Sequence, residues 1–287
     1  MNTRRPESWL RVFTRFHTRH YLSPDGTKAA NWLYDRVKQV GRSNPAITVT
    51  RFEHEWKQPS IIAQIPGQNP GLVIAGAHLD SIGGPSPDAR SPGADDNGTG
   101  VVILLEVLRV LASYRFKPIN TLEFHFYAAE ESGRNGSMDV FSHYSASGKH
   151  VLAMLNQDMA GRSPSKRFAI LTDYVDAGLT RFVEVVATAY TGQAPLRTQC
   201  GWPCSDHASA THFGYPAACV IEDQIEKINP DMHTAEDTFD KVNWKTVHRH
   251  AALTLGFMVE ASYIEDGYAP GNLNRVERDD HDIPEFV

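Results

Sequence analysis

The chain has 287 residues, of which 41% are hydrophobic and 22% are charged, and its formal net charge is −6. This length can bury one large core, so we expect a single domain. The negative charge gives no electrostatic attraction to nucleic acid or anionic lipid, and no apolar run is long enough to span a bilayer.

The chain is predicted to begin with helices and to continue with strands. Residues 1–20 carry charges among their apolar positions, which predicts an amphipathic helix and not the unbroken apolar stretch of a signal peptide. The spacing of apolar residues predicts a second helix from Thr27 to Val40. Strands are expected at 47–52, 60–65 and 71–77, and the last is a continuous apolar run typical of a central strand.

A loop rich in Gly, Pro and Ser over residues 81–94 precedes an alternation of helices and strands. The predicted segments are helices at 98–111, 136–147, 179–190 and 243–263, and strands at 121–128, 151–157, 168–172 and 216–221. This alternation predicts the α/β class, as a single-domain three-layer α/β/α sandwich with a mixed, largely parallel central sheet. The domain is expected to span residues 1–266, followed by an acidic tail with Pro and Gly over 267–287.

Polar residues follow the predicted strands at the ends where α/β sheets bind their ligands. His78 and Asp80 come directly after the strand 71–77, and a carboxylate near a metal-ligating histidine can accept its other ring N–H. Taken alone, a histidine at this place is more often a hydrogen-bonded structural residue. Asp95 and Asp96 precede a helix, where one aspartate would serve as a cap and the other could bridge two cations.

Further candidates lie at the ends of the next strands. Glu130 and Glu131 close the strand 121–128, but the residues alone do not tell which would bind a cation and which would act as a base. Asp158 ends the following strand and His233 lies in NPDMHT, where each alone would be taken for a cap or a surface residue. Together, two histidines and several carboxylates at one edge suit Zn²⁺ or a similar first-row ion, and the excess of carboxylates suits a pair of ions.

The three cysteines leave several possibilities open. Cys200 and Cys204 lie close together in CGWPC, and Cys219 stands in an apolar, strand-like run. The near pair could form a short disulfide, a redox site or half of a metal site. A structural zinc site is disfavoured because the chain has no second pair of cysteines to complete it.

Seven motifs, in this order, resemble the bacterial leucyl aminopeptidase family of secreted dizinc exopeptidases, which is also represented in fungi. They are AGAHLDS, SPGADDNGTG, YAAEESG, LNQDMAG, CGWPCSDHAS, GYPAACVIE and NPDMHTAEDT. Weaker similarity extends over residues 20–263. The resemblance implies a zinc-dependent aminopeptidase that hydrolyses the N-terminal peptide bond of peptides with a free N-terminus and prefers large apolar, leucine-like N-terminal residues.

The resemblance also implies roles for the candidate residues. One zinc would be held by His78 and Asp158 and a second by Glu131 and His233, with Asp96 as the bridging ligand. Glu130 would be the general base that activates a metal-bridging water, and Asp80 would orient His78.

A disulfide and a substrate pocket are implied in the same way. Cys200 and Cys204 would be joined, in a short loop beside the site. The apolar pocket would be lined by Met159, Leu171, Trp202, Cys204, Cys219, Ile221, Ile225, Ile228 and Met232. Of these, Cys219 and Ile221 would equally suit the core. Trp202 stands where the family commonly has a tyrosine, whose hydroxyl can bond an oxyanion, whereas an indole offers only its N–H.

Three other functions remain possible at this point. A carboxypeptidase or dipeptidase of related fold is disfavoured because the sequence shows no obvious insertion for a dimerisation domain. A glutaminyl cyclase of the same fold would share much of the ligand set but usually works with one zinc. A non-catalytic binding domain derived from a peptidase would typically have lost ligands or the base, and here all are present. The implied disulfide and the habit of the family predict an extracellular protein, with a signal peptide or pro-region absent from this chain, and we expect a monomer.

Overall fold

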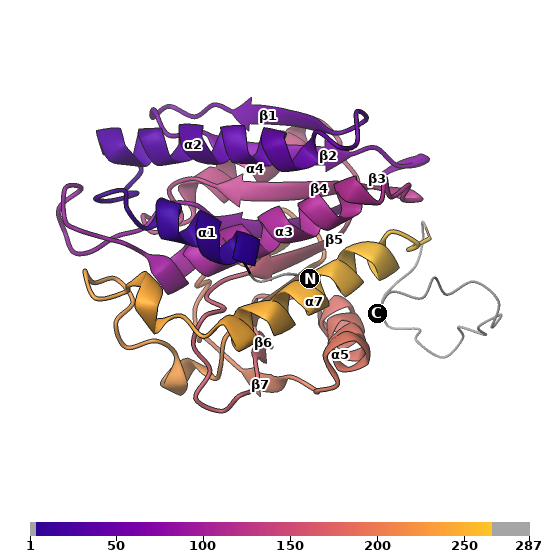
Figure 1. Cartoon of the computed structure of the whole chain (residues 1–287). Coiled ribbons are helices and arrows are strands. Elements are labelled where there is room, and N and C mark those ends of the chain that lie inside the picture. Colours follow the sequence, from indigo (N-terminus) through magenta and orange to yellow (C-terminus); the bar gives the residue numbers. More distant parts are fainter. Residues whose placement is uncertain (1–3, 266–287) are drawn as a thin grey trace.

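The computed structural model describes residues 4–265, which form a mixed eight-stranded sheet with helices on both faces (Figure 1). The tail predicted at 267–287 therefore lies outside the described residues. Across the sheet the strand order is β1-β2-β4-β3-β5-β8-β6-β7. The strands are β1 Thr48–Phe52, β2 Ser60–Ile65, β3 Asn69–His78, β4 Asn120–Tyr127, β5 Val151–Gln157, β6 Ala169–Leu171, β7 Leu196–Thr198 and β8 Ala217–Ile221.

The central strands β4, β3, β5 and β8 are parallel neighbours. Antiparallel pairs occur towards the edges, between β1 and β2, β2 and β4, and β6 and β8, while β6 and β7 are parallel. The mixed, largely parallel sheet is thus confirmed. The register places His78 beside Tyr127 and Gly76 beside Asn156, so the carboxyl ends of β3, β4 and β5 lie at one edge.

The helices form the two outer layers of the sandwich. They are α1 Arg4–Phe13, α2 Pro24–Gly41, α3 Gly100–Ser113, α4 Asn135–Ala146, α5 Ala177–Thr191, α6 His207–His212 and α7 Trp244–Ala261. One face is covered by α2, α3, α5 and α7, with α1 packed on α3, and the other face by α4 and α6 (Figure 1). Because both faces are covered, β3 is buried from Gly71 to His78, as its continuous apolar run predicts. None of the described helices has the length and apolar character needed to cross a membrane.

The N-terminal segment differs from its prediction. Among the described residues of this segment, α1 spans Arg4–Phe13, and the chain then leaves the helix before Ser23 caps α2 by accepting the N–H of Gly26 at 2.8 Å. In between, Thr18 and Arg19 are buried and bond to the loop that follows β3. The prediction of one helix over 1–20 was therefore wrong in its second half, because polar groups there bond to a distant loop and not to helix backbone.

Candidate metal centre

His78 ends β3 and lies at the centre of a cluster of carboxylates. Its side chain is 1% exposed, and its Nε2 lies 3.1 Å from Oδ1 of Asp96 and 3.3 Å from Oδ1 of Asp158. The other ring nitrogen, Nδ1, is 3.6 Å from Asp80, a charge contact that is too long for a hydrogen bond. Both carboxylates and the histidine were selected from sequence as ligands of one ion, and here they lie together.

Asp80 makes its hydrogen bonds to the loop that follows β4. Its Oδ1 accepts the backbone N–H of Glu130 at 3.0 Å, and its Oδ2 accepts that of Glu131 at 3.2 Å. Just before them, Ala129 has a positive φ of 52°, so the chain has already turned out of the strand. This turn is the feature needed for two consecutive glutamates to serve one site, since neighbours in a strand point to opposite sides.

Glu130 is a buried carboxyl, 8% exposed. Burial, with repulsion from Asp206, Asp158 and Glu131, raises the pKa of Glu130 well above its ordinary value. A raised pKa makes a carboxylate a better proton acceptor, which suits a general base.

Asp96 lies between the two histidines of the cluster. Its Oδ1 is 3.1 Å from Nε2 of His78, and its Oδ2 is 3.0 Å from Nε2 of His233. Burial opposes ionisation of Asp96, but the contacts with His233 and His78 outweigh it and hold the pKa of Asp96 below its ordinary value. One ionised carboxylate thus offers one oxygen to each half of the cluster.

The neighbouring Asp95 has a structural place. Its Oδ1 accepts the N–H of Gly161 at 2.6 Å, and its own N–H donates to both carboxylate oxygens of Asp237 at 3.1 Å. The N–H of Asp96 also donates to Asp237, at 3.0 Å. Asp237 therefore holds the backbone of the Asp95–Asp96 pair in the same way that Asp80 holds that of Glu130 and Glu131.

His233 completes the second half of the cluster. Its Nε2 lies 2.8 Å from Oε2 of Glu131, in addition to its contact with Asp96. The side chain is 43% exposed, so this half of the cluster is the more open one. His233 also has a positive φ of 60°.

These side chains could hold metal: His78, Asp96 and Glu131 each offer one ligand atom, and these atoms all lie within 4.8 Å of one another. A tetrahedral ion with ligand bonds of about 2.0–2.1 Å separates its ligand atoms by about 3.3 Å. The contacts among His78, Asp96 and Asp158, and among His233, Asp96 and Glu131, span 2.8–3.3 Å. Glu131 also has an oxygen, Oε1, that is buried and has no hydrogen-bond partner. Buried carboxylates in this number call for cations to compensate their charge.

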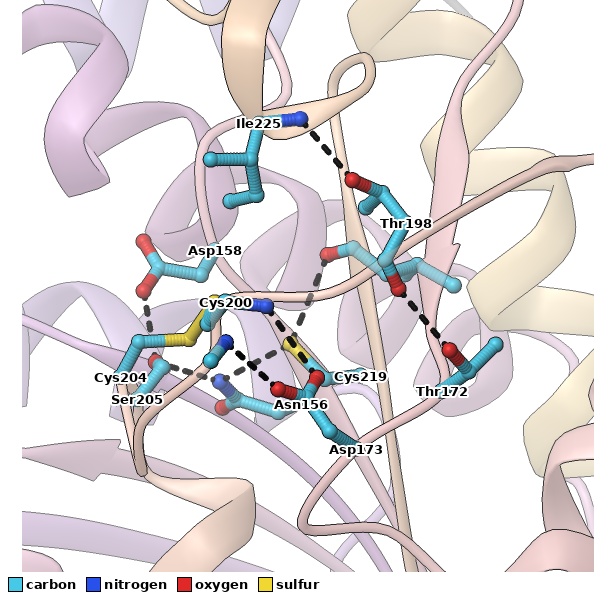
Figure 2. The surroundings of a disulfide bond; sticks show 12 residues. Asn156, Asp158, Thr172, Asp173, Thr198, Cys200, Cys204, Ser205, Cys219 and Ile225 are labelled. Carbon is cyan, nitrogen blue, oxygen red and sulfur yellow. Dashed lines mark hydrogen bonds between the residues drawn. A yellow bond between two sulfur atoms is a disulfide. The ribbon is translucent and has the colours of Figure 1, made fainter.

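A disulfide joins Cys200 and Cys204, with an S–S distance of 1.99 Å, and Cys219 is free and buried. Asp173 anchors this loop by accepting the N–H groups of Cys200 at 3.2 Å and Gly201 at 2.7 Å (Figure 2). Of the possibilities that CGWPC raises, the structure therefore has the short disulfide.

Ser205, directly after the disulfide, contacts the carboxylate cluster around His78. Its Oγ donates to Oδ2 of Asp158 at 2.6 Å and accepts from Nδ2 of Asn156 at 2.8 Å (Figure 2). The loop closed by the disulfide thus contacts a candidate ligand through one hydroxyl. Ser205, Asp237 and Arg19 are absent from the sequence-based site, although Ser205 and Asp237 fall inside the motifs CGWPCSDHAS and NPDMHTAEDT.

An apolar cluster lies beside the disulfide. It is formed by buried residues of β6 and β8 with side chains from β7 and the surrounding loops, namely Ala169, Leu171, Cys219, Ile221, Val175, Leu196, Cys200, Cys204, Ile225 and Ile228. Six of the nine residues expected to line a pocket are among them. Met159, Trp202 and Met232 lie outside this cluster, and Trp202 is 61% exposed.

Comparison with known proteins gives consistent matches. Residues 60–258 match the family model described as peptidase family M28. Leucine aminopeptidase 1 of Coccidioides posadasii (strain C735) is 44% identical over 269 residues, which cover 88% of this chain and 69% of that protein. The LapA aminopeptidase of Legionella pneumophila superposes with a TM-score of 0.86 at 28% identity, covering 92% of this chain and 73% of the other. A zinc aminopeptidase from Bacillus subtilis gives a TM-score of 0.62 at 28% identity, covering 75% and 53%.

Proposed function

The chain belongs to peptidase family M28, and we propose that the side chains at its sheet edge hold two zinc ions for the hydrolysis of N-terminal peptide bonds. It is a zinc-dependent aminopeptidase, a hydrolase that acts on peptides. The observation that carries the proposal is the position of Asp96, whose two oxygens face one histidine each at 3.1 and 3.0 Å.

The ligands divide into two sets that share Asp96. His78 and Asp158 would hold one ion, and Glu131 and His233 the other. Bound zinc supplies Lewis-acid polarisation of the scissile carbonyl and lowers the pKa of water at the site. The hydroxyl of Ser205 donates to Asp158 and keeps it in place. The carboxylate of Asp237 accepts the backbone N–H of Asp96 and keeps that residue in place.

Glu130 is the base in this proposal. Its carboxylate takes a proton from the attacking water and gives it to the leaving amine, so one group acts first as base and then as acid. Asp80 accepts the backbone N–H of Glu130, and this bond restricts the positions that the Glu130 carboxylate can reach. Burial supports the same role, since it raises the pKa of Glu130 well above the ordinary range.

The apolar cluster next to the disulfide would receive the side chain of the N-terminal residue. Ile225 and Ile228 are half-buried and offer branched aliphatic surface there, above the buried Leu171, which suits leucine-like side chains. The α-amine of the substrate would face the carboxylates of the metal cluster, and an acylated amine would lose that attraction. Trp202 offers an indole N–H at the place where the family commonly has a tyrosine hydroxyl.

An extracellular location belongs to the proposal as well. The Cys200–Cys204 disulfide supports it, because disulfides form and persist in oxidising compartments.

Three substrates test the proposal. Leucyl-p-nitroanilide is expected to be cleaved, N-acetyl-leucyl-p-nitroanilide to be spared, and a peptide that begins with glutamine to be trimmed and not cyclised. Equal cleavage of the free and acetylated substrates would contradict exopeptidase action. Formation of pyroglutamate without release of amino acids would assign the site to a glutaminyl cyclase.

A further inference from the structure

Arg19 is a fully buried cation next to the metal cluster, with no part in the proposed chemistry. Its side chain is 0% exposed. Its Nε donates to the carbonyl of Leu79 at 2.8 Å, its Nη2 to the carbonyl of Gly93 at 2.8 Å, and its Nη1 to the carbonyl of Pro92. All hydrogen bonds recorded for its guanidinium within residues 4–265 go to backbone carbonyls.

The three carbonyls belong to the two loops that present ligands. Leu79 lies between His78 and Asp80, and Gly93 directly precedes the segment Ala94–Thr99 that carries Asp96. One planar guanidinium therefore spans the gap between these loops. The N–H donors of a guanidinium form a fork with fixed relative positions, so together they set the distance between the two loops. A single hydrogen bond from a flexible side chain would not do so.

Gly93 fits this arrangement. It has a positive φ of 49°, and a Cβ placed on it would lie 2.7 Å from Nη2 of Arg19 and 2.5 Å from Cβ of Ser81. The loop thus approaches the guanidinium as closely as only a glycine permits.

The charge of Arg19 also faces the cluster. Burial lowers the pKa of Arg19 to about 10, opposed first by Asp237 and then by Asp80, so the group stays charged at neutral pH. These two carboxylates are the ones that hold the backbones of Asp95–Asp96 and Glu130–Glu131.

The N-terminal segment holds Arg19 in place. Its guanidinium lies 4.3 Å above the ring of Phe13 from α1, its backbone N–H donates to Oγ of Ser81 at 3.2 Å, and its carbonyl accepts Nε2 of Gln58 at 2.9 Å. Phe13, Arg19 and Gln58 all precede the region that matches the family model, residues 60–258, whereas Ser81 lies inside it.

We propose that Arg19 is a positioning residue that fixes the spacing between the loop of His78 and the loop of Asp96, so that an N-terminal segment outside the family match sets the geometry of the metal site. This inference rests on the proposed function for the identity of the ligands. It concerns their placement and not the peptidase reaction itself.

The test is the affinity for zinc of the purified full-length protein, measured by chelator competition. Arg19→Met keeps the aliphatic stem and removes the fork, and zinc affinity is expected to fall roughly 10- to 100-fold, with a lower kcat and little change in KM. Arg19→Lys keeps the charge but cannot reach all three carbonyls, so an intermediate loss is expected. Arg51→Met is the control, because Arg51 lies 3.7 Å above the ring of Tyr34 but is exposed on β1 and far from the ligand loops.

Three results would overturn the proposal. A folded Arg19→Met protein with wild-type zinc affinity would show that the fork positions nothing. A higher affinity would show that Arg19 only balances charge, because removal of one cation favours binding of another. If Arg19→Met does not fold, as judged by circular dichroism of the metal-free protein, then wild-type affinity in Arg19→Lys would have the same meaning. Zinc affinity is measured without substrate, so failure of the wild type to cleave leucyl substrates would contradict the proposed function alone.

Discussion

Asp80 accepts the backbone N–H of Glu130 at 3.0 Å, so the residue two positions after His78 also holds the backbone of the proposed base. The second oxygen of the same carboxylate accepts the N–H of Glu131 at 3.2 Å. The loop that carries His78 and the proposed base, Glu130, are thereby joined through the buried side chain of Asp80.

This contact predicts the effect of Asp80→Asn. The amide would present an N–H₂ group to one of two N–H donors, which would loosen the turn that carries Glu130. We expect kcat to fall roughly 10- to 100-fold with little change in KM. Asp223→Asn is the matched control, because Asp223 is a buried carboxylate that accepts N–H groups of Ser165 and Gln224 away from the ligands. Equal losses in the two variants would point to general destabilisation.

Replacement of Glu130 by glutamine should separate catalysis from metal binding. The amide cannot take a proton from water, so kcat is expected to fall by about 10²- to 10⁴-fold. Metal content per chain, measured by elemental analysis, should stay at the wild-type level. A glutamine variant that works at the wild-type rate would remove Glu130 from the role of base.

The count of metal ions is tested by two aspartates. Asp96 contacts both histidines, whereas Asp158 contacts only His78. Asp158→Asn should therefore weaken one ion, while Asp96→Asn should weaken both. Zinc retained per chain after gel filtration distinguishes these outcomes, and equal retention in the two variants would contradict a shared bridging ligand.

A buried acid pair predicts how stability depends on pH. Burial, with repulsion from Asp95, raises the pKa of Glu222 far above its ordinary value. The folded protein thus keeps a proton that the unfolded chain releases above a carboxyl pKa of about 4.3. The stability that this proton provides is complete below that pH and is lost as pH rises towards the raised pKa of Glu222.

Asp95→Asn should reduce this dependence. A shared proton bonds the side chains of Asp95 and Glu222, and an amide N–H₂ on residue 95 could donate to ionised Glu222 without disturbing the bond from Gly161 to Oδ1. We expect a higher Tm than that of the wild type at pH 8–9, measured on the metal-free proteins by thermal denaturation. A Tm that falls as steeply with pH as in the wild type would show that the pair does not hold the proton.

The central layer of this protein follows from its sequence pattern. The apolar run 71–77 predicts a covered central strand, and β3 is that strand. The strand-end rule then places His78, Glu131 and Asp158 at one edge, where the structure has them. The assignment of each ligand came from the resemblance, because strand periodicity does not distinguish the glutamate that binds from its neighbour.

The residues that hold the candidate ligands in place, Arg19, Asp80 and Asp237, are not indicated by any periodic pattern in the sequence. Arg19 falls in the segment 1–20, where charges among apolar positions predict an amphipathic helix, but its partners are carbonyls about 60 to 74 positions away. The clamps from Asp80 and Asp237 also join side chains to distant backbone amides. Such contacts depend on where loops meet in space, and any carboxylate or arginine in a loop looks the same in the sequence.

The position of Arg19 bears on where this enzyme can be shortened. A fragment cut to the region that matches the family model, residues 60–258, would contain every proposed ligand and the proposed base. It would lack the arginine and the Phe13 ring beneath it, together with the capped start of α2. If Arg19 positions the loops as proposed, a trimmed protein would keep all the candidate ligands but bind zinc poorly, so a fragment intended to work should begin no later than α1.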